Sequence, residues 1–267
     1  MSSRVYGIDI GSRSIGLVVL GEEGVEHSLS VPTTYDVLKQ CRAVLEGVSG
    51  CLAVATGYGR KLFLKEFGVP GRFGRVLDIT EIQAHALGAR ALYPTARTVL
   101  DIGGQDTKVI AMTPGGKVVR FEMNDRCAAG TGKFLEFMAT ALQTPLDRFG
   151  GFALGADKRI AISSMCTVFA ETEATTLMAL GERAENIAMG LHLAIAGRVQ
   201  SMIGRIGCEP PLVFSGGVAR NPCIVRLLEE GLGMAPLIPR DPDLVGALGA
   251  ALHGKALLSK QSSLEAV

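Results

Sequence analysis

Hydrophobic positions in the first third of the chain follow the short period of β-strands. Apolar residues alternate or run together over 5–10, 15–20 and 25–31, with glycine-containing turns between these segments. The pattern predicts three antiparallel strands. Helical spacing over 35–45 predicts a helix capped by Thr33 or Thr34. A short strand at 51–55, a glycine loop at 56–60 leading into a helix, and a helix at 78–91 complete this half.

The second half repeats that order with an insertion. Strands are expected at 98–102, 108–112, 117–123 and 212–214, and helices at 131–142, 167–180, 185–206, 222–231 and 244–257, with a glycine-rich linker at 144–157. Three strands, a helix, a strand and a helix, given twice, predict a duplicated α/β architecture. We expect the last helix to return to the first domain.

The same aspartate phrase opens both halves. Residues 7–11 read Gly-Ile-Asp-Ile-Gly and residues 100–104 read Leu-Asp-Ile-Gly-Gly, so Asp9 and Asp101 are 92 residues apart, a spacing that suits domain duplication. A strand that ends in Asp before a glycine turn brings backbone N–H groups close to an anion, and its carboxylate can hold a metal ion through water. One copy alone is equally well explained as a turn former. Two copies facing each other would hold a Mg²⁺–nucleotide polyphosphate.

Two further glycine motifs extend this hypothesis. Residues 214–219 read Phe-Ser-Gly-Gly-Val-Ala after a predicted strand, and paired glycines there let the backbone approach a base or ribose. Small residues at 246–251 suit close packing at a hinge, or an ordinary buried helix. Residues 129–134 resemble a P-loop, but Cys127 stands where its first glycine belongs and Phe134 where a Mg²⁺-binding hydroxyl belongs.

Composition narrows the classes of function. The chain has 267 residues, about half of them apolar, and a net charge of +1, which gives no general attraction to nucleic acid or membrane. We find no signal peptide and no apolar run long enough to span a bilayer, so we expect a cytoplasmic protein. The six cysteines form no C-x-x-C pair. Reduced thiols or a cluster site are therefore favoured over a disulfide framework.

Two cysteines lie in motifs of their own, at 124–132 (Asn-Asp-Arg-Cys-Ala-Ala-Gly-Thr-Gly) and at 163–171 (Ser-Ser-Met-Cys-Thr-Val-Phe-Ala-Glu). Cys127 and Cys166 are each expected immediately before a helix, where free N–H groups and the helix dipole favour a thiolate and a negatively charged cluster. We expect Thr131 to cap one helix and Thr167 or Ser164 the other. Two thiolates are too few for a cubane cluster, but a symmetric dimer supplies four. Buried small hydrophobic residues are the alternative interpretation.

In their order, these pieces resemble the superfamily of acetate and sugar kinases, heat-shock chaperones and actin over the whole chain. The resemblance implies two phosphate loops, two connecting helices and an adenosine loop, at 9–12, 101–106, 78–90, 246–253 and 215–221 respectively. It implies α/β domains of duplicated ribonuclease-H-like (actin-like ATPase) type with a nucleotide cleft between them. The first would span 1–95 plus the C-terminal helix at 244–260, and the second 96–243, with both motif cysteines.

Within that superfamily the chain resembles the ATP-dependent activators of 2-hydroxyacyl-CoA dehydratases, in the group that also holds benzoyl-CoA reductase ATPase subunits. The shared phrases lie at 55–60, 101–106, 215–219 and in the two cysteine motifs. One departure is Ala84, where relatives commonly have Cys. The other cysteines, at 41, 51, 208 and 223, have no partner motif, so we expect them to be core or surface residues.

The resemblance implies a homodimer with one 4Fe–4S cluster between its subunits, held by Cys127 and Cys166 of each, and ATP or ADP with Mg²⁺ in each subunit. A ferredoxin or flavodoxin would reduce the cluster, and ATP would drive one electron into the dehydratase. Two alternatives stay open. One is an ATPase subunit or activator of a benzoyl-CoA-reductase-type iron–sulfur enzyme. The other is a small-molecule kinase of the same fold, whose acceptor base and sugar loop we do not find.

On this basis we assign the expected site residues. Asp9 and Asp101 would hold the Mg²⁺ water shell, and Gln105 would orient the attacking water, with Glu81 as a second candidate. The phosphate-binding residues would be Gly11, Ser12, Arg13, Gly103 and Gly104. The adenosine-binding residues would be Ser215, Gly216, Gly217, Ala219 and Asn221. Arg13 and Lys108 are either phosphate contacts or solvated surface charges.

Overall fold

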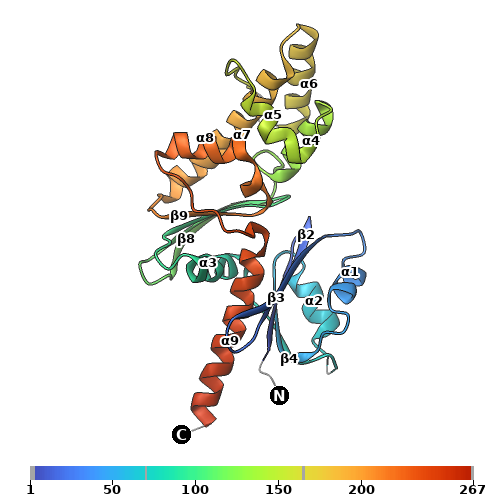
Figure 1. Ribbon diagram of the computed structural model, residues 1–267, viewed down its shortest axis with the longest axis vertical. Coiled ribbons are helices and arrows are strands. Elements are labelled where there is room, and N and C mark those ends of the chain that lie inside the picture. Colours follow the sequence, from blue (N-terminus) through green and yellow to red (C-terminus); the bar gives the residue numbers. More distant parts are fainter. Residues whose placement is uncertain (1–3, 70, 164–165, 266–267) are drawn as a thin grey trace. The chain divides into compact units, whose positions relative to one another are not determined.

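The chain folds into two compact units, each with its own sheet. The computed structural model describes residues 4–69, 71–163 and 166–265. The first unit comprises the described parts of 1–96, 112–118 and 239–267, and the second comprises those of 97–111 and 119–238. Figure 1 labels the elements of both.

The first unit is built on a five-stranded sheet with the order β3-β2-β1-β4-β5. Its strands are β1 (Val5–Ile10), β2 (Ser14–Leu20), β3 (Val25–Pro32), β4 (Gly50–Thr56) and β5 (Phe73–Asp78). The first three form an antiparallel meander, whereas β4 and β5 continue the sheet in parallel with β1. Asp9 is therefore aligned with Thr56 at the carboxyl ends of two neighbouring parallel strands.

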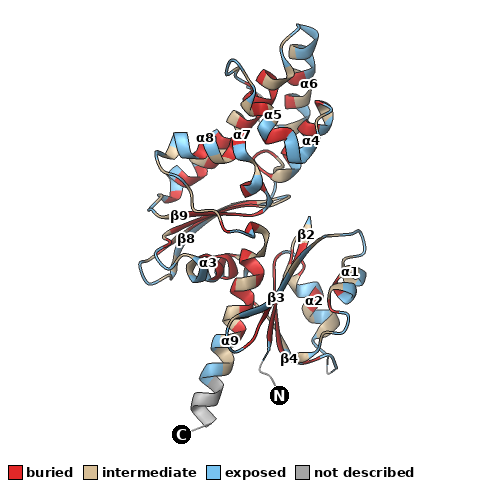
Figure 2. Cartoon of the chain, in the orientation of Figure 1, coloured by how far each residue is buried: buried red, intermediate tan, exposed pale blue. Residues whose placement is uncertain are grey.

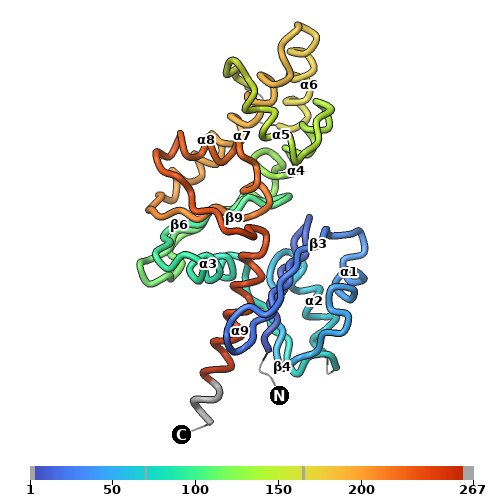
Figure 3. Tube along the Cα trace, in the orientation of Figure 1, coloured from blue at the N-terminus to red at the C-terminus, as the bar shows by residue number. Residues whose placement is uncertain are grey.

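Four helices belong to this unit: α1 (Val37–Val44), α2 (Arg60–Phe67), α3 (Glu81–Leu92) and α9 (Val245–Glu265). The last of them packs on β1, β2, β4 and α3, as expected, and its trace can be followed beside these strands in Figure 3. Gly7 makes the approach possible, because a Cβ atom there would lie 2.0 Å from the carbonyl oxygen of Ala247. The C-terminal helix is therefore part of the first core.

The second unit holds a four-stranded sheet with the order β8-β7-β6-β9. The strands are β6 (Thr98–Ile102), β7 (Thr107–Met112), β8 (Val118–Asn124) and β9 (Leu212–Ser215). Strands β6 and β7 form an antiparallel hairpin, and β9 joins β6 in parallel. Asp101 at the end of β6 thereby has Lys108 as its partner on one side and Ser215 on the other.

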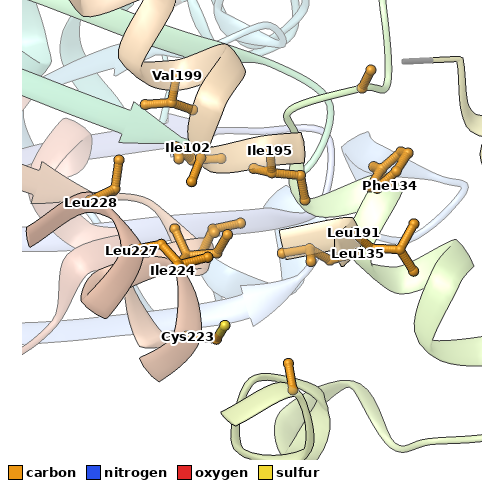
Figure 4. Close-up of a cluster of buried hydrophobic side chains, with 14 of the residues drawn as sticks. Ile102, Phe134, Leu135, Leu191, Ile195, Val199, Cys223, Ile224, Leu227 and Leu228 are labelled. Atoms are coloured by element: carbon orange, nitrogen blue, oxygen red, sulfur yellow. The ribbon is translucent and has the colours of Figure 1, made fainter. Parts of the chain in front are cut away.

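The second unit also contains α4 (Gly132–Ala141), α5 (Leu146–Leu154), α6 (Thr167–Ala179), α7 (Ala184–Ile206) and α8 (Pro222–Leu232). Their shared core joins Ile102 of β6 to Phe134 and Leu135 of α4, Leu191 and Ile195 of α7, and Ile224 and Leu227 of α8 (Figure 4). Helix α7 is buried along most of its length (Figure 2), whereas α6 buries only two alanines, Ala170 and Ala174.

Three expectations about local structure are wrong. Strand β5 and helix α5 were expected as loop and linker, and the cap of α1 is Asp36, whose Oδ1 accepts a hydrogen bond from the N–H of Lys39 at 2.9 Å. Two short 3₁₀ helices, η1 (Gly217–Arg220) and η2 (Pro242–Leu244), complete the elements of the described chain. No helix within the described residues is long and apolar enough to cross a membrane.

Candidate functional site

The carboxylate of Asp9 lies between two glycine backbones at the end of β1. A Cβ atom on Gly57 would lie 2.3 Å from Asp9 Oδ1, and one on Gly246 would lie 2.1 Å from Asp9 Oδ2. Gly57 also has φ +80°, a conformation that only glycine adopts without strain. The small residues of the 56–60 loop and of α9 therefore set the position of this carboxylate.

His85, which the sequence analysis did not single out, lies close to the same carboxylate. It is buried on α3, with its Nδ1 donating to the carbonyl oxygen of Glu81 at 3.0 Å. Its Cε1 atom lies 2.9 Å from the Cβ position of Gly246, beside Asp9. Glu81 is the first residue of α3 and is half-buried. A histidine four residues after Glu81, on the same helix face, was the available signal.

The loop after Asp9 is closed by its own backbone. The N–H of Gly11 donates to the carbonyl oxygen of Ser14 at 3.0 Å, and the Thr33 hydroxyl donates to the carbonyl oxygen of Gly11 at 2.9 Å. Ser12 is half-buried and Arg13 is exposed. Thr33, expected as a helix cap, instead fastens this loop.

The carboxylate of Asp101 is buried and bonded on both oxygens. Lys108 Nζ lies 3.1 Å from Asp101 Oδ2 and 2.7 Å from Asp106 Oδ2, and the Ser215 hydroxyl donates to Asp101 Oδ1 at 3.0 Å. The Lys108 side chain is only 3% exposed. The expectation that Lys108 is either a phosphate contact or a solvated charge is therefore wrong in its second half, because this lysine belongs to a buried ion-pair network.

The second phosphate loop is bonded directly to the start of α4. The N–H of Gly103 donates to the carbonyl oxygen of Asp106 at 2.9 Å and closes the turn. The carbonyl oxygens of Gly103 and Gly104 accept from the N–H groups of Gly132 and Lys133, at 2.9 and 2.7 Å. These two amides are used within the protein, which agrees with the rejection of a P-loop at 129–134. Gln105 is exposed between the two glycines and Asp106.

The predicted adenosine loop begins at Ser215 and ends at the cap of α8. Ser215 and Ala219 are buried, whereas Gly217 is exposed. Gly216 has φ +83°, and a Cβ atom there would lie 2.4 Å from the carbonyl oxygen of Ile102, so its close approach to β6 requires glycine.

Asn221 is committed to helix capping. Its Oδ1 accepts from the N–H groups of Cys223 and Ile224 at 3.0 and 3.1 Å, and its Nδ2 donates to His192 Nε2 at 3.0 Å. Because His192 Nδ1 donates to the carbonyl oxygen of Ala188, the ring is a neutral tautomer. Burial lowers the pKa of His192 to about 4. Adenosine contacts for the 215–221 loop stay a prediction.

Cys127 lies in a loop held by one asparagine. Asn124 Nδ2 donates to the carbonyl oxygens of Cys127 and Ala129 at 2.9 and 3.0 Å. Cys127 is half-buried and packs against the core of the second unit. Helix α4 begins only at Gly132, so the expectation that Cys127 stands immediately before a helix is wrong.

The capping threonine of α4 also behaves differently from the expectation. Thr131 occupies the N-cap position, but its hydroxyl donates to the carbonyl oxygen of Ala128 at 2.6 Å and caps no helical N–H. It therefore stabilises the Cys127 loop rather than the helix end.

Cys166 is exposed and occupies the N-cap position of α6 itself, as expected. Thr167 is the first residue of that helix and makes no capping hydrogen bond. Ser164, the other expected cap, lies outside the described residues. Helices α4 and α6 pack together within the second unit, so both cysteine motifs belong to one folded body.

The remaining cysteines are core or surface residues, as expected. Burial raises the pKa of the Cys41 thiol to about 11 and that of Cys223 to about 12, and it also raises the pKa of Cys208. Cys51 is exposed, with its Sγ 3.1 Å from the carbonyl oxygen of Arg4. Among the described residues, no group of three or more His, Cys, Asp or Glu side chains is arranged to hold a metal ion.

Comparison with known proteins identifies the family. The model of the BadF/BadG/BcrA/BcrD ATPase family matches residues 6–254. The chain belongs to this family of ATPases. One family relative, the (R)-2-hydroxyglutaryl-CoA dehydratase activating ATPase of Acidaminococcus fermentans, is 37% identical over 264 residues, which is 95% of this chain and 97% of that protein. A subunit of the benzoyl-CoA reductase of Thauera aromatica is 37% identical over 176 residues, covering 64% of this chain and 62% of that protein.

The fold is that of the actin-like ATPases, as the sequence predicts. The solved activator of the 2-hydroxyisocaproyl-CoA dehydratase from Clostridium difficile, with bound ADPNP, superposes with a TM-score of 0.84 at 34% identity. The match covers 98% of both chains.

Proposed function

We propose that this ATPase is a reductive activator that passes a low-potential electron to a 2-hydroxyacyl-CoA dehydratase. Membership in the BadF/BadG/BcrA/BcrD family and the activator function of its full-length relative from Acidaminococcus fermentans support this proposal. The dehydratase would bind the acyl-CoA, so the activator itself needs no acyl-CoA pocket.

In this proposal ATP and Mg²⁺ are bound through the two aspartate loops. Backbone N–H groups of Gly11, Ser12, Gly103 and Gly104 would face the phosphates, as tight glycine turns allow. Asp9 would hold Mg²⁺ through water, because carboxylates are preferred ligands of this ion. Gln105 is exposed in its loop and is free to orient an attacking water, as a side-chain amide does in other phosphohydrolases.

Cys127 and Cys166 are the residues that would hold a 4Fe–4S cluster. Their donor chemistry fits, because thiolates are the ligands of such clusters, and a cubane needs four of them. One chain offers two cysteine motifs in one folded unit, and no described group of three metal-binding side chains competes with them. A homodimer with the cluster on its two-fold axis would complete the set. Such a cluster supplies one-electron transfer at a potential that its surroundings tune.

The observation that carries the proposal is the bonded start of α4. The amides of Gly132 and Lys133 are held by the carbonyl oxygens of Gly103 and Gly104, in the phosphate loop, while the preceding loop contains Cys127. A change of this loop on nucleotide binding or hydrolysis would move the start of α4 and the Cys127 loop together. ATP turnover and the environment of the electron carrier would thus be coupled within one unit.

A second candidate function is that of an ATPase component in a benzoyl-CoA-reductase-type enzyme. The similarity to the benzoyl-CoA reductase of Thauera aromatica, in the one component that matches, supports this alternative. Both candidates need a low-potential electron donor, for which ferredoxin or flavodoxin is suited. Isolation under anaerobic conditions distinguishes them, since a free homodimer supports the activator and tight heterologous subunits support the reductase.

Iron analysis of anaerobically purified variants tests the proposal. Replacing either Cys127 or Cys166 by Ala removes two of four ligands in a dimer, so each variant should lose nearly all of its iron, while wild type holds about four iron atoms per dimer. Cys51→Ala, another exposed thiol, is the matched control and should keep its iron. Activation of a dehydratase should vanish in both ligand variants, whereas ATP binding should persist.

Two results would contradict the proposal. Iron retained by Cys166→Ala would exclude the shared cluster. A colourless monomer whose ATP turnover depends on an added sugar would favour the kinase alternative instead.

A further inference from the structure

The two aspartate hairpins differ at one position that faces the carboxylate. In the first hairpin the cross-strand partner of Asp9 is Gly16, whereas in the second hairpin the partner of Asp101 is Lys108. Space at Gly16 is filled by the first unit itself, because a Cβ atom there would meet Leu244 Cδ2 at 3.1 Å. The same register therefore places a glycine beside one aspartate and an ammonium group beside the other.

Lys108 forms a buried bridge across the second phosphate loop. Its ammonium nitrogen lies 3.1 Å from a carboxylate oxygen of Asp101, before the loop, and 2.7 Å from one of Asp106, at the end of the loop. The side chains of Lys108 and Asp101 are 3% and 5% exposed, so solvent screens their attraction little. Ser215 adds a hydrogen bond to the other oxygen of Asp101.

This bridge determines the shape of the loop between the two aspartates. The backbone closes the turn once, from the N–H of Gly103 to the carbonyl oxygen of Asp106 at 2.9 Å. Lys108 closes it a second time through side chains. Without the ammonium group, two carboxylates that both lie within 3.1 Å of one nitrogen would repel each other and open the loop.

We infer that Lys108 is a positioning residue that acts as a tethered cation of the second hairpin. It holds Asp101 and Asp106 together, so that the loop amides are preorganised for nucleotide phosphates, and it leaves Mg²⁺ to the Asp9 side. The role rests on the proposed nucleotide function, because it concerns the same phosphate loop. It predicts that a cation, rather than any particular side chain, is what the position requires.

Binding of Mg·ADP to the full-length chain, measured by calorimetry, tests this role. Lys108→Ala should weaken binding by roughly 10- to 100-fold, as loss of a supporting ion pair does at other metal–ligand sites. Added n-propylammonium, which replaces the missing atoms and charge, should restore most of the affinity. The neutral analogue 1-propanol should not. Lys117→Ala, an exposed lysine on the turn after β7, is the matched control and should bind as wild type does, with or without the amine.

A milder variant covers the case in which Lys108→Ala does not fold. Asp106→Ala removes one carboxylate of the bridge at a side chain that is 27% exposed, and it should weaken Mg·ADP binding by a smaller factor. Unchanged affinity in either variant, or a loss in folded Lys108→Ala that propylammonium does not reverse, would overturn the tethered-cation role. Failure of wild type to bind Mg·ADP would instead refute the proposed function on which it rests.

Discussion

Replacing Gly246 by alanine should damage nucleotide binding far more than stability. The new Cβ atom would lie 2.1 Å from Asp9 Oδ2 and 2.9 Å from His85 Cε1. The carboxylate oxygen must withdraw by about 1 Å to reach an ordinary contact distance. Gly57 blocks the opposite side, since its own Cβ position is 2.3 Å from Asp9 Oδ1. Asp9 must therefore rotate or shift away from the position at which we propose it serves Mg²⁺.

The free energies follow from two opposing terms. Alanine in place of glycine inside a helix gains about 1 kcal/mol of helix propensity. Overpacking costs about 1–3 kcal/mol, and the cost is near the lower end at Gly246 because the contact is with a side-chain end. The free energy of unfolding of Gly246→Ala should therefore stay within about 1 kcal/mol of wild type. A displacement of about 1 Å at Asp9 should lower nucleotide turnover by about 100-fold.

Two other glycines provide the controls. A Cβ atom at Gly249, one turn further along α9, would lie 1.7 Å from the backbone carbonyl oxygen of Ala84, which cannot withdraw. Gly249→Ala should therefore lose about 2 kcal/mol of stability. Gly204 in α7 has no atom within 4 Å of its Cβ position, so Gly204→Ala should gain about 1 kcal/mol.

Urea unfolding and Mg·ATP turnover of the three variants give the comparison. We expect Gly249→Ala to be the least stable and Gly246→Ala to be the least active, with Gly204→Ala normal in turnover. If activity simply followed stability across the three, the packing of Asp9 between glycines would have no functional meaning, and its proposed role at Mg²⁺ would be refuted.

Two further predictions concern thiols and pH. Iodoacetamide at pH 8 should label exposed Cys51 in every preparation and Cys166 only after iron removal, while mass spectrometry should find Cys41 and Cys223, whose pKa values are raised to about 11 and 12, unlabelled until the chain unfolds. Because burial lowers the pKa of His192 to about 4, the unfolded chain takes up a proton that the folded chain refuses, so the free energy of unfolding should fall by about 3 kcal/mol from pH 6.5 to 4. His192→Gln should flatten that slope in urea titrations, and an unchanged slope would contradict the assignment.

Strands β1 and β6 were predictable to the residue because each is an apolar run that ends at a glycine turn. Strand β5 was not, because Phe73–Asp78 contains Gly74 and the exposed Arg75 and lacks alternation. Its assignment depends on parallel pairing with β4, a tertiary contact that local pattern does not encode.

Helix α5 was missed for a related reason. Gly150 and Gly151 lie inside it and lower its intrinsic helix propensity. The structure explains Gly150, because a Cβ atom there would lie 2.4 Å from Asn221 Oδ1. Close packing against the cap of α8 requires the glycine and overrides the propensity. A glycine-rich segment was thus interpreted as a linker although one of its glycines serves helix packing.

The candidate site divides in the same way. The loops at Asp9 and Asp101 were predictable, since a repeated local motif marks them. The burial of Lys108 follows from hairpin register, because residues 101 and 108 are equidistant from the turn, and that signal was available. The position of His85 was not predictable, because it depends on Gly246 from a helix more than 150 residues away in sequence.

The return of α9 to the first sheet has a consequence for how the protein is made. Strands β1 and β4 leave the ribosome early, but the helix that covers them is synthesised after the whole of the second unit. The second unit is nearly continuous and can fold while synthesis proceeds, whereas the first remains with an exposed apolar face until residues beyond 245 have been added. The nascent chain therefore carries an incomplete Asp9 loop for most of its synthesis, and chaperone binding should concentrate on that uncovered sheet.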